Sequence, residues 1–304
     1  MLLVQLGAPL NASGFMFAIL ISVCVIGVPH GGLDHLTGRQ WFSNSCGRLW
    51  IAPFFLGYLA IAGLTIAGWL LFPLWTAIGF FMISANHFGR DDRLSEPSIE
   101  TVPVWSALTA IGSGGLVIWI PAIARPFEMQ QILQAIIPTG IGVSSEAIVF
   151  WTQVLARVFV PVALADIAYS LASATARTQG GIARVLRHSL LICMLIITPI
   201  PFSFCLFFCG WHSIRGLSQL MYQHRMTLNQ LTVAALPMSL GAIALCSIGA
   251  WFWGSGREST AELTRTLFLG LSGMAVPHLV LHDVMPALIR RNHCRSKLKI
   301  QSAA

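Results

Sequence analysis

The chain has 304 residues, of which 56% are hydrophobic and only 10% are charged. A soluble globular domain carries about 25% charged residues, so this composition excludes an ordinary water-soluble protein and indicates an integral membrane protein. The net charge of +7 comes from basic residues scattered between apolar runs. This scatter argues against a nucleic-acid partner, which would be bound by a clustered basic patch.

The apolar runs predict an all-α, polytopic transmembrane helix bundle of about nine spans, with roughly eight to ten allowed by the chain length. Residues 1–304 are expected to form a single membrane domain, with residues 290–304 as a basic tail. The first run is expected to be a permanent span because no basic segment precedes it. The predicted spans cover residues 14–36, 50–71, 74–90, 103–124, 148–173, 186–201, 202–222, 231–253 and 263–289.

One boundary between predicted spans is open to two interpretations. The sixth and seventh spans are separated only by residues 198–201, which read Thr-Pro-Ile-Pro. This segment is either a tight turn between two helices or a kink in one long helix.

The basic residues also predict the orientation of the bundle. With nine spans, Arg125 and Arg257 fall on one side of the membrane and thirteen other basic residues on the opposite side. Since cytoplasmic loops are rich in lysine and arginine, we expect a cytoplasmic C-terminus, an outside N-terminus and a location in the cell (inner) membrane. The thirteen are Arg39, Arg48, Arg90, Arg93, Arg177, Arg184, Arg187, Arg225, Arg290, Arg291, Arg295, Lys297 and Lys299.

Four histidine motifs interrupt the apolar pattern on the first, third, seventh and ninth spans. They are PHGGLDH (29–35), HFGRDD (87–92), CGWHSIR (209–215) and VPHLVLHD (276–283), and they contain His30, His87, His212 and His278. These odd-numbered spans all run in the same direction. The four histidines lie about 16, 13, 10 and 15 residues from the span starts, which places them within a layer about 9 Å deep at about 1.5 Å per residue. Four imidazoles from four helices can therefore converge at one depth.

The chemistry of imidazole favours a shared metal site for this set. Imidazole is a good ligand for iron, copper and zinc, and its second nitrogen needs a hydrogen-bond partner that fixes the ring. A single membrane histidine can equally form an interhelical hydrogen bond, but four at one depth with carboxylates nearby favour a metal. The side chains expected to support the ligands are Asp34, His35, Asp91, His282 and Asp283, with Asp92 beside them in the sequence.

Small residues and prolines accompany the histidines. Gly31, Gly32 and Gly89 are expected either to let helix backbones approach closely or to leave room for a substrate. Pro29 and Pro277 each precede a histidine, so we expect their helices to kink there.

The remaining polar residues of the spans are interpreted as structural. His188 lies at a predicted helix start, His224 in a loop and His293 in the basic tail, so all three are expected at the membrane interface. Asp166 is expected to pair with a neighbouring arginine or serine. The seven cysteines form no CxxC pair and are expected to fill the core.

At the four histidine motifs the sequence resembles the Brp/Blh family of bacterial and archaeal β-carotene 15,15'-dioxygenases, membrane proteins that cleave β-carotene centrally into two retinal molecules. The motifs match in order and spacing over nearly the whole chain. The resemblance implies an enzyme that uses Fe(2+), β-carotene and O2 within membrane lipid. It also implies a microbial rhodopsin as a user of the retinal.

The resemblance also implies a ligand set, from which this chain departs at one position. The iron would be held by the histidine of PHGxxD, that of HFG and the two of HSxxH, which fall on His30, His87, His212 and Gly216. Position 216 is one helical turn from position 212, but glycine supplies no ligand. Three outcomes remain: His278 or another span histidine completes the set, three histidines suffice, or the site is weakened.

Two other functions are compatible with the motifs. A non-catalytic carotenoid- or retinal-binding membrane protein would explain Gly216, and a bis-histidine haem protein would explain paired membrane histidines. The clustered HxxxH and HxxHH boxes of desaturase-like enzymes are absent from the sequence, and the buried charge pairs of a transporter pathway are not evident.

Overall fold

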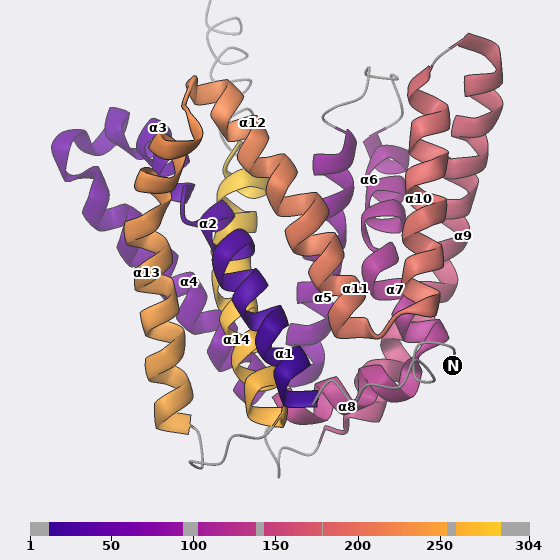
Figure 1. The fold of residues 1–304 in the computed structure, drawn as a ribbon, viewed down its shortest axis with the longest axis horizontal. Coiled ribbons are helices and arrows are strands. Elements are labelled where there is room, and N and C mark those ends of the chain that lie inside the picture. Colours follow the sequence, from indigo (N-terminus) through magenta and orange to yellow (C-terminus); the bar gives the residue numbers. More distant parts are fainter. Residues whose placement is uncertain (1–11, 94–102, 138–142, 178, 254–259, 287–304) are drawn as a thin grey trace, which may run out of the picture.

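The computed structural model describes residues 12–93, 103–137, 143–177, 179–253 and 260–286, and these form helices and short connections without a strand. Figure 1 shows most of the long helices running side by side. The predicted all-α bundle is thus confirmed. The helices are α1 (Ala12–Ser22), η1 (Val23–Gly27), α2 (Val28–Gly31), α3 (Asp34–Cys46), η2 (Gly47–Trp50), α4 (Ile51–Leu71), α5 (Pro73–Arg93), α6 (Pro103–Gly114), α7 (Leu116–Ala124), α8 (Pro126–Ile136), α9 (Ser145–Arg177), α10 (Gln179–Ile197), α11 (Ile200–Cys205), η3 (Leu206–Ser213), α12 (Ile214–His224), α13 (Leu228–Trp253), α14 (Thr260–Leu279) and η4 (Val280–Val284).

Fewer helical stretches than predicted are long and apolar enough, by themselves, to cross a membrane. Among the described residues there are five, or six if α6 and α7 count as one bent span. The nine predicted spans are therefore not confirmed. Helices do occupy the other predicted spans, but α5 ends in the charged residues Arg90, Asp91 and Asp92. The five are Gly14–Ser43, Gly47–Leu71, Ser145–Tyr169, Leu228–Trp251 and Ala261–Val284.

The predicted span 103–124 is not one straight helix. Helices α6 and α7 meet at Gly115 and are bent by 54°. The Trp119 indole N–H donates to the Ile111 carbonyl across the break at 3.1 Å, and a Cβ at Gly115 would collide with the Trp119 ring. The glycine therefore makes room for the side chain that closes the bend.

The Thr-Pro-Ile-Pro segment is a turn between two helices. Helix α10 ends at Ile197 and α11 begins at Ile200. The Arg125 guanidinium donates to the carbonyls of Ile196 and Ile197 at 3.0 and 2.8 Å. The Glu128 carboxylate accepts a 2.8 Å hydrogen bond from the Ile200 N–H. Two side chains from the start of α8 thus supply hydrogen-bond partners for backbone carbonyls at the end of α10 and for a backbone N–H at the start of α11.

Helix α8 itself is absent from the sequence prediction, which assigned only membrane spans. It lies across one end of the bundle in Figure 1. Its buried residues Met129, Ile132, Leu133 and Ile136 follow the i, i+3, i+4, i+7 spacing of an amphipathic helix, and Pro126 begins it. The apolar spacing and the proline that indicate α8 can therefore be recognised in the sequence.

Helices α5 and α6 make the closest backbone approach near the histidine motifs. A Cβ at Gly89 would overlap the backbone of Ala110, and one at Gly114 would overlap the backbone of Gly89 and the carbonyl of Ala85. The expected role of Gly89 in close helix packing therefore agrees with the geometry. Gly32 packs closely against α13 in the same way, because a Cβ added at this position would lie 2.6 Å from Ser239 Oγ.

We expect Gly89→Ala to destabilise the protein by about 1–3 kcal/mol, because the new methyl group forces α5 away from the α6 backbone. Thermal unfolding of the purified protein in detergent measures the effect. Gly79→Ala is the matched control, since it lies in the same helix and its Cβ would meet no atom within 4 Å. Equal melting temperatures for the two variants would contradict the close packing.

Candidate metal centre

Four histidines from four parts of the chain lie together inside the bundle. They are His30 of α2, His87 of α5, His212 of η3 and His278 of α14, and we call them the histidine cluster. The centroid of the His30 ring lies 5.0 Å from both His212 and His278. The His87 centroid lies 5.4 Å from His212 and 5.3 Å from His278. The four rings thus surround one point, and all are at most 9% exposed.

Wide helical turns accompany three of the four histidines. The π-helical segment η1 ends three residues before His30, η3 contains His212, and η4 begins two residues after His278. A π turn adds a residue to the helix and is frequent at functional sites. The prolines predicted kinks near His30 and His278, whereas the π turns themselves were not predicted.

Carboxylates support three of the cluster rings through Nδ1. His87 Nδ1 donates to Asp283 Oδ2 at 3.1 Å, and His278 Nδ1 donates to Asp34 Oδ1 at 2.8 Å. His212 Nδ1 lies 3.4 Å from Asp91 Oδ2. Each contact fixes a ring and leaves Nε2 as the nitrogen available to a ligand.

Asp34 is shared by several groups. Besides His278, its Oδ1 accepts a 3.1 Å hydrogen bond from His282 Nε2. Its Oδ2 accepts one from the Tyr58 hydroxyl at 3.0 Å. Tyr58 was missed from the sequence, although it is one of the few polar side chains in its apolar span. By spacing alone, Asp34, His278 and His282 could also hold a metal ion, but the hydrogen bonds identify Asp34 as a support for the two rings.

The predicted supporting residue His35 lies apart from the cluster contacts. Its Nδ1 is 3.0 Å from the Gly32 carbonyl one turn earlier. The structure therefore brings Asp34, Asp91, His282 and Asp283 toward the cluster and gives His35 a local hydrogen bond.

The unsatisfied nitrogens of the cluster fit a metal ion. His30 Nδ1, His30 Nε2 and His87 Nε2 are buried and have no hydrogen-bond partner among the described residues. Leaving such a group unpaired costs about 1–3 kcal/mol. A set of imidazoles held by carboxylates is a suitable donor set for iron, copper or zinc, so the residues present fit the iron that the resemblance implies.

Gly216 is positioned where a side chain would displace a cluster histidine. It lies on α12, one turn after His212, and a Cβ built on it would overlap the His30 imidazole. The His30 ring therefore occupies the space that a side chain at position 216 would need. Of the three outcomes left open by the sequence, this arrangement favours completion of the cluster by His278.

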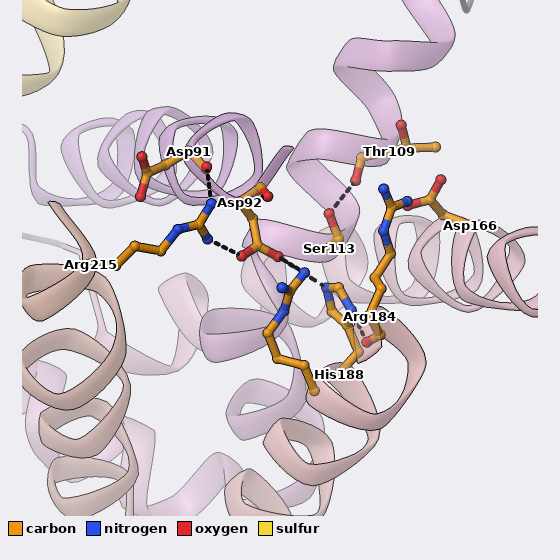
Figure 2. Close-up of polar contacts among 9 residues, drawn as sticks. Asp91, Asp92, Thr109, Ser113, Asp166, Arg184, His188 and Arg215 are labelled. Atoms are coloured by element: carbon orange, nitrogen blue, oxygen red, sulfur yellow. Dashed lines mark hydrogen bonds and ion pairs between the residues drawn. The ribbon is translucent and has the colours of Figure 1, made fainter. Parts of the chain in front are cut away.

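A partly buried ion-pair network lies behind Asp91 and joins α5, α10 and α12. Figure 2 shows Asp92 held by Arg215, with His188 beside it. The Asp92 carboxylate accepts 2.7 Å hydrogen bonds from Arg215 and from Arg187. Arg215 also donates to the Asp91 carbonyl at 2.8 Å. The network therefore fixes the end of α5 that carries Asp91.

The network gives a partner to His188, and Asp166 pairs nearby. His188 was expected at the membrane interface, but it is 4% exposed and its Nε2 lies 3.7 Å from Asp92. The contact shows a partner for His188 that was not predicted, while its interfacial position stays a prediction. Asp166 does pair with an arginine, since it lies 3.7 Å from Arg184. His224 ends α12 and is half-buried, and His293 and the tail 290–304 lie outside the described residues.

The histidine cluster lines a large apolar cavity of about 680 Å³. All four cluster histidines contribute to its wall, together with phenylalanines and the buried face of α8. Gly31 also lines it, and its Cβ would meet no atom within 4 Å. The phenylalanines in the wall include Phe80, Phe81, Phe204, Phe208 and Phe268.

Comparisons with known proteins agree with the motifs. A family model described as beta-carotene 15,15'-dioxygenase matches residues 21–286. A probable beta-carotene 15,15'-dioxygenase, Blh, of Halobacterium salinarum is 26% identical over 295 residues, which cover 90% of this chain and 85% of the relative. A beta-carotene 15,15'-dioxygenase of an uncultured marine bacterium is 24% identical over 288 residues, which cover 92% of this chain and 96% of the relative. No solved structure matches significantly.

Proposed function

Because this chain belongs to the β-carotene 15,15'-dioxygenase family, we propose that it cleaves β-carotene at its central double bond with O2 and forms two molecules of retinal. The observation that carries the proposal is the histidine cluster in the wall of a large apolar cavity. This arrangement combines a set of metal ligands with a space suited to a long hydrocarbon.

Fe(2+) is the proposed cofactor, with His30, His87, His212 and His278 as its ligands. When bound, iron would supply the activation of O2 that a set of neutral side chains cannot. Asp34, Asp91 and Asp283 orient three of the ligand rings. The buried nitrogens of His30 and His87 without hydrogen bonds are the structural support for this assignment.

The protein's own contribution is to bind and orient the polyene and to exclude water. The apolar wall matches a substrate that is insoluble in water, so that binding requires no polar contact along the polyene. The phenylalanine rings of the wall pack against a flat conjugated system, and Gly31 leaves open space directly beside His30. The substrate is thereby held next to the cluster in a dry environment.

The alternative functions receive less support from the same geometry. The non-catalytic binding protein rested on Gly216, and His278 occupies a position in the cluster that offsets this loss. For a bis-histidine haem, four imidazoles with neighbouring centroids 5.0–5.4 Å apart leave no space for a macrocycle between them.

We also propose that the protein spans the cell (inner) membrane about nine times, with its N-terminus outside and its C-terminus in the cytoplasm. The helices α5, α10 and α11–α12 would supply the spans that hydropathy alone does not identify. The retinal formed would remain in the membrane, where a microbial rhodopsin is the proposed user.

The function is tested by expressing the chain in cells that accumulate β-carotene. We expect the cells to lose their colour and retinal to appear in the lipid extract, and the purified protein to contain iron. Persistent β-carotene without retinal, despite correctly inserted protein, would contradict the activity. A Soret band in the purified protein would instead support a haem protein.

A further inference from the structure

The cavity beside the histidine cluster reaches the surface of the bundle at one place. Among the described residues that line it, the exposed ones all belong to two helices, whereas the others are buried or half-buried. Leu59 and Leu245, for example, are 52% and 59% exposed. We call this place the α4–α13 opening, formed by Leu59 and Gly63 of α4 and by Pro237, Gly241 and Leu245 of α13.

The arrangement of the helices explains the opening. Helices α4 and α13 both pack on α14 and make little contact with each other. Both lie to the left of α14 in Figure 1. The space between them is therefore not filled by a direct helix–helix interface.

The α4–α13 opening lies at mid-depth of two membrane-spanning stretches. Leu59 is the central residue of the apolar stretch Gly47–Leu71, and Gly241 lies next to the centre of Leu228–Trp251. If these stretches cross the bilayer, the opening faces the acyl chains and not the headgroups or water. A ligand that passes through it must therefore come from the hydrocarbon interior.

Two glycines keep the opening wide. A Cβ at Gly63 or at Gly241 would meet no atom within 4 Å, so each position has room for a side chain but carries none. Gly31, the sequence neighbour of His30, also lines the cavity and has open space at its Cβ position. Glycines therefore line the cavity both at the opening and next to a cluster residue.

We propose that the isoprenoid polyene substrate enters the cavity directly from the bilayer through the α4–α13 opening, and that Gly63 and Gly241 set its width. The identity of this ligand rests on the proposed function. The apolar lining, the histidine cluster at the inner wall and the opening at mid-membrane depth together select a long hydrocarbon that is dissolved in lipid.

The proposal is tested with Gly63→Trp and Gly241→Trp, which place a large side chain at the opening, at positions where a Cβ meets no atom within 4 Å. The matched controls are Gly57→Trp and Gly249→Trp on the same two helices. These glycines also have open space at Cβ but do not line the cavity. Two quantities are measured for each variant: the β-carotene that the protein takes up from lipid vesicles in the absence of O2, where no cleavage occurs, from its visible absorbance, and the initial rate of retinal formation from β-carotene in vesicles with O2 present.

We expect both quantities to fall at least about tenfold in the two variants at the opening, while the controls stay within about twofold of the wild type. Wild-type levels in Gly63→Trp and Gly241→Trp would overturn the proposal, and so would equal losses in all four variants. If the wild type binds β-carotene but forms no retinal, the cleavage activity fails, and the binding measurement still decides whether the opening admits the ligand.

Discussion

Alanine in place of His278 is expected to abolish retinal formation and to lower the iron content of the purified protein at least about tenfold. His278 is the fourth member of the cluster in this chain, with its Nδ1 already bound by Asp34 at 2.8 Å. Its removal leaves three ligands, and Asp34 keeps only the hydrogen bonds from His282 and Tyr58. Iron is measured by elemental analysis and retinal by chromatography of the lipid extract.

The control for His278→Ala is His224→Ala at the end of α12, outside the cluster. It should keep both its iron and its activity. If His278→Ala also keeps both, three histidines are sufficient and His278 has only a structural role. A variant that inserts into the membrane but loses iron separates a ligand defect from failed folding.

A histidine at position 216 is expected to inactivate this chain, although the family motif has a histidine there. Because a Cβ at Gly216 would overlap the His30 ring, Gly216→His forces His30 out of its place. We expect iron content and retinal yield to fall at least about tenfold. The same measurements as for His278→Ala provide the readout.

Gly210→His is the matched control for this substitution. Gly210 lies in η3, two residues before His212, and its Cβ would meet no atom within 4 Å. The control should therefore retain iron. If Gly216→His instead raises iron and retinal together, His30 yields to the new ligand and the natural site is an impaired form of the family site.

Much of the candidate site could be predicted from the sequence, because polar side chains are costly inside a membrane and are therefore rare there. His30, His87, His212 and His278 stood out against apolar runs, and a count of residues from each span start placed them at one depth. Their ring contacts fit that expectation. The same contrast made Asp91 and Asp283 visible as supports.

Pairings between distant helices could not be predicted in this way. Hydrophobic periodicity identifies a helix but does not say which helices touch. Asp34 was therefore associated with its sequence neighbours, whereas its ring partners, His278 and His282, are on another helix. For the same reason Tyr58 was missed, and the contact of His188 with Asp92 was not predicted.

The ion-pair network around Asp92 braces one side of the histidine cluster. Arg187 and Arg215 tie α10 and α12 to the end of α5 through two short, partly buried hydrogen bonds (Figure 2). No comparable described tie joins α4 to α13. The helical segments that carry His87 and His212 are therefore joined by ion pairs to one another, whereas the two helices of the α4–α13 opening are joined through α14.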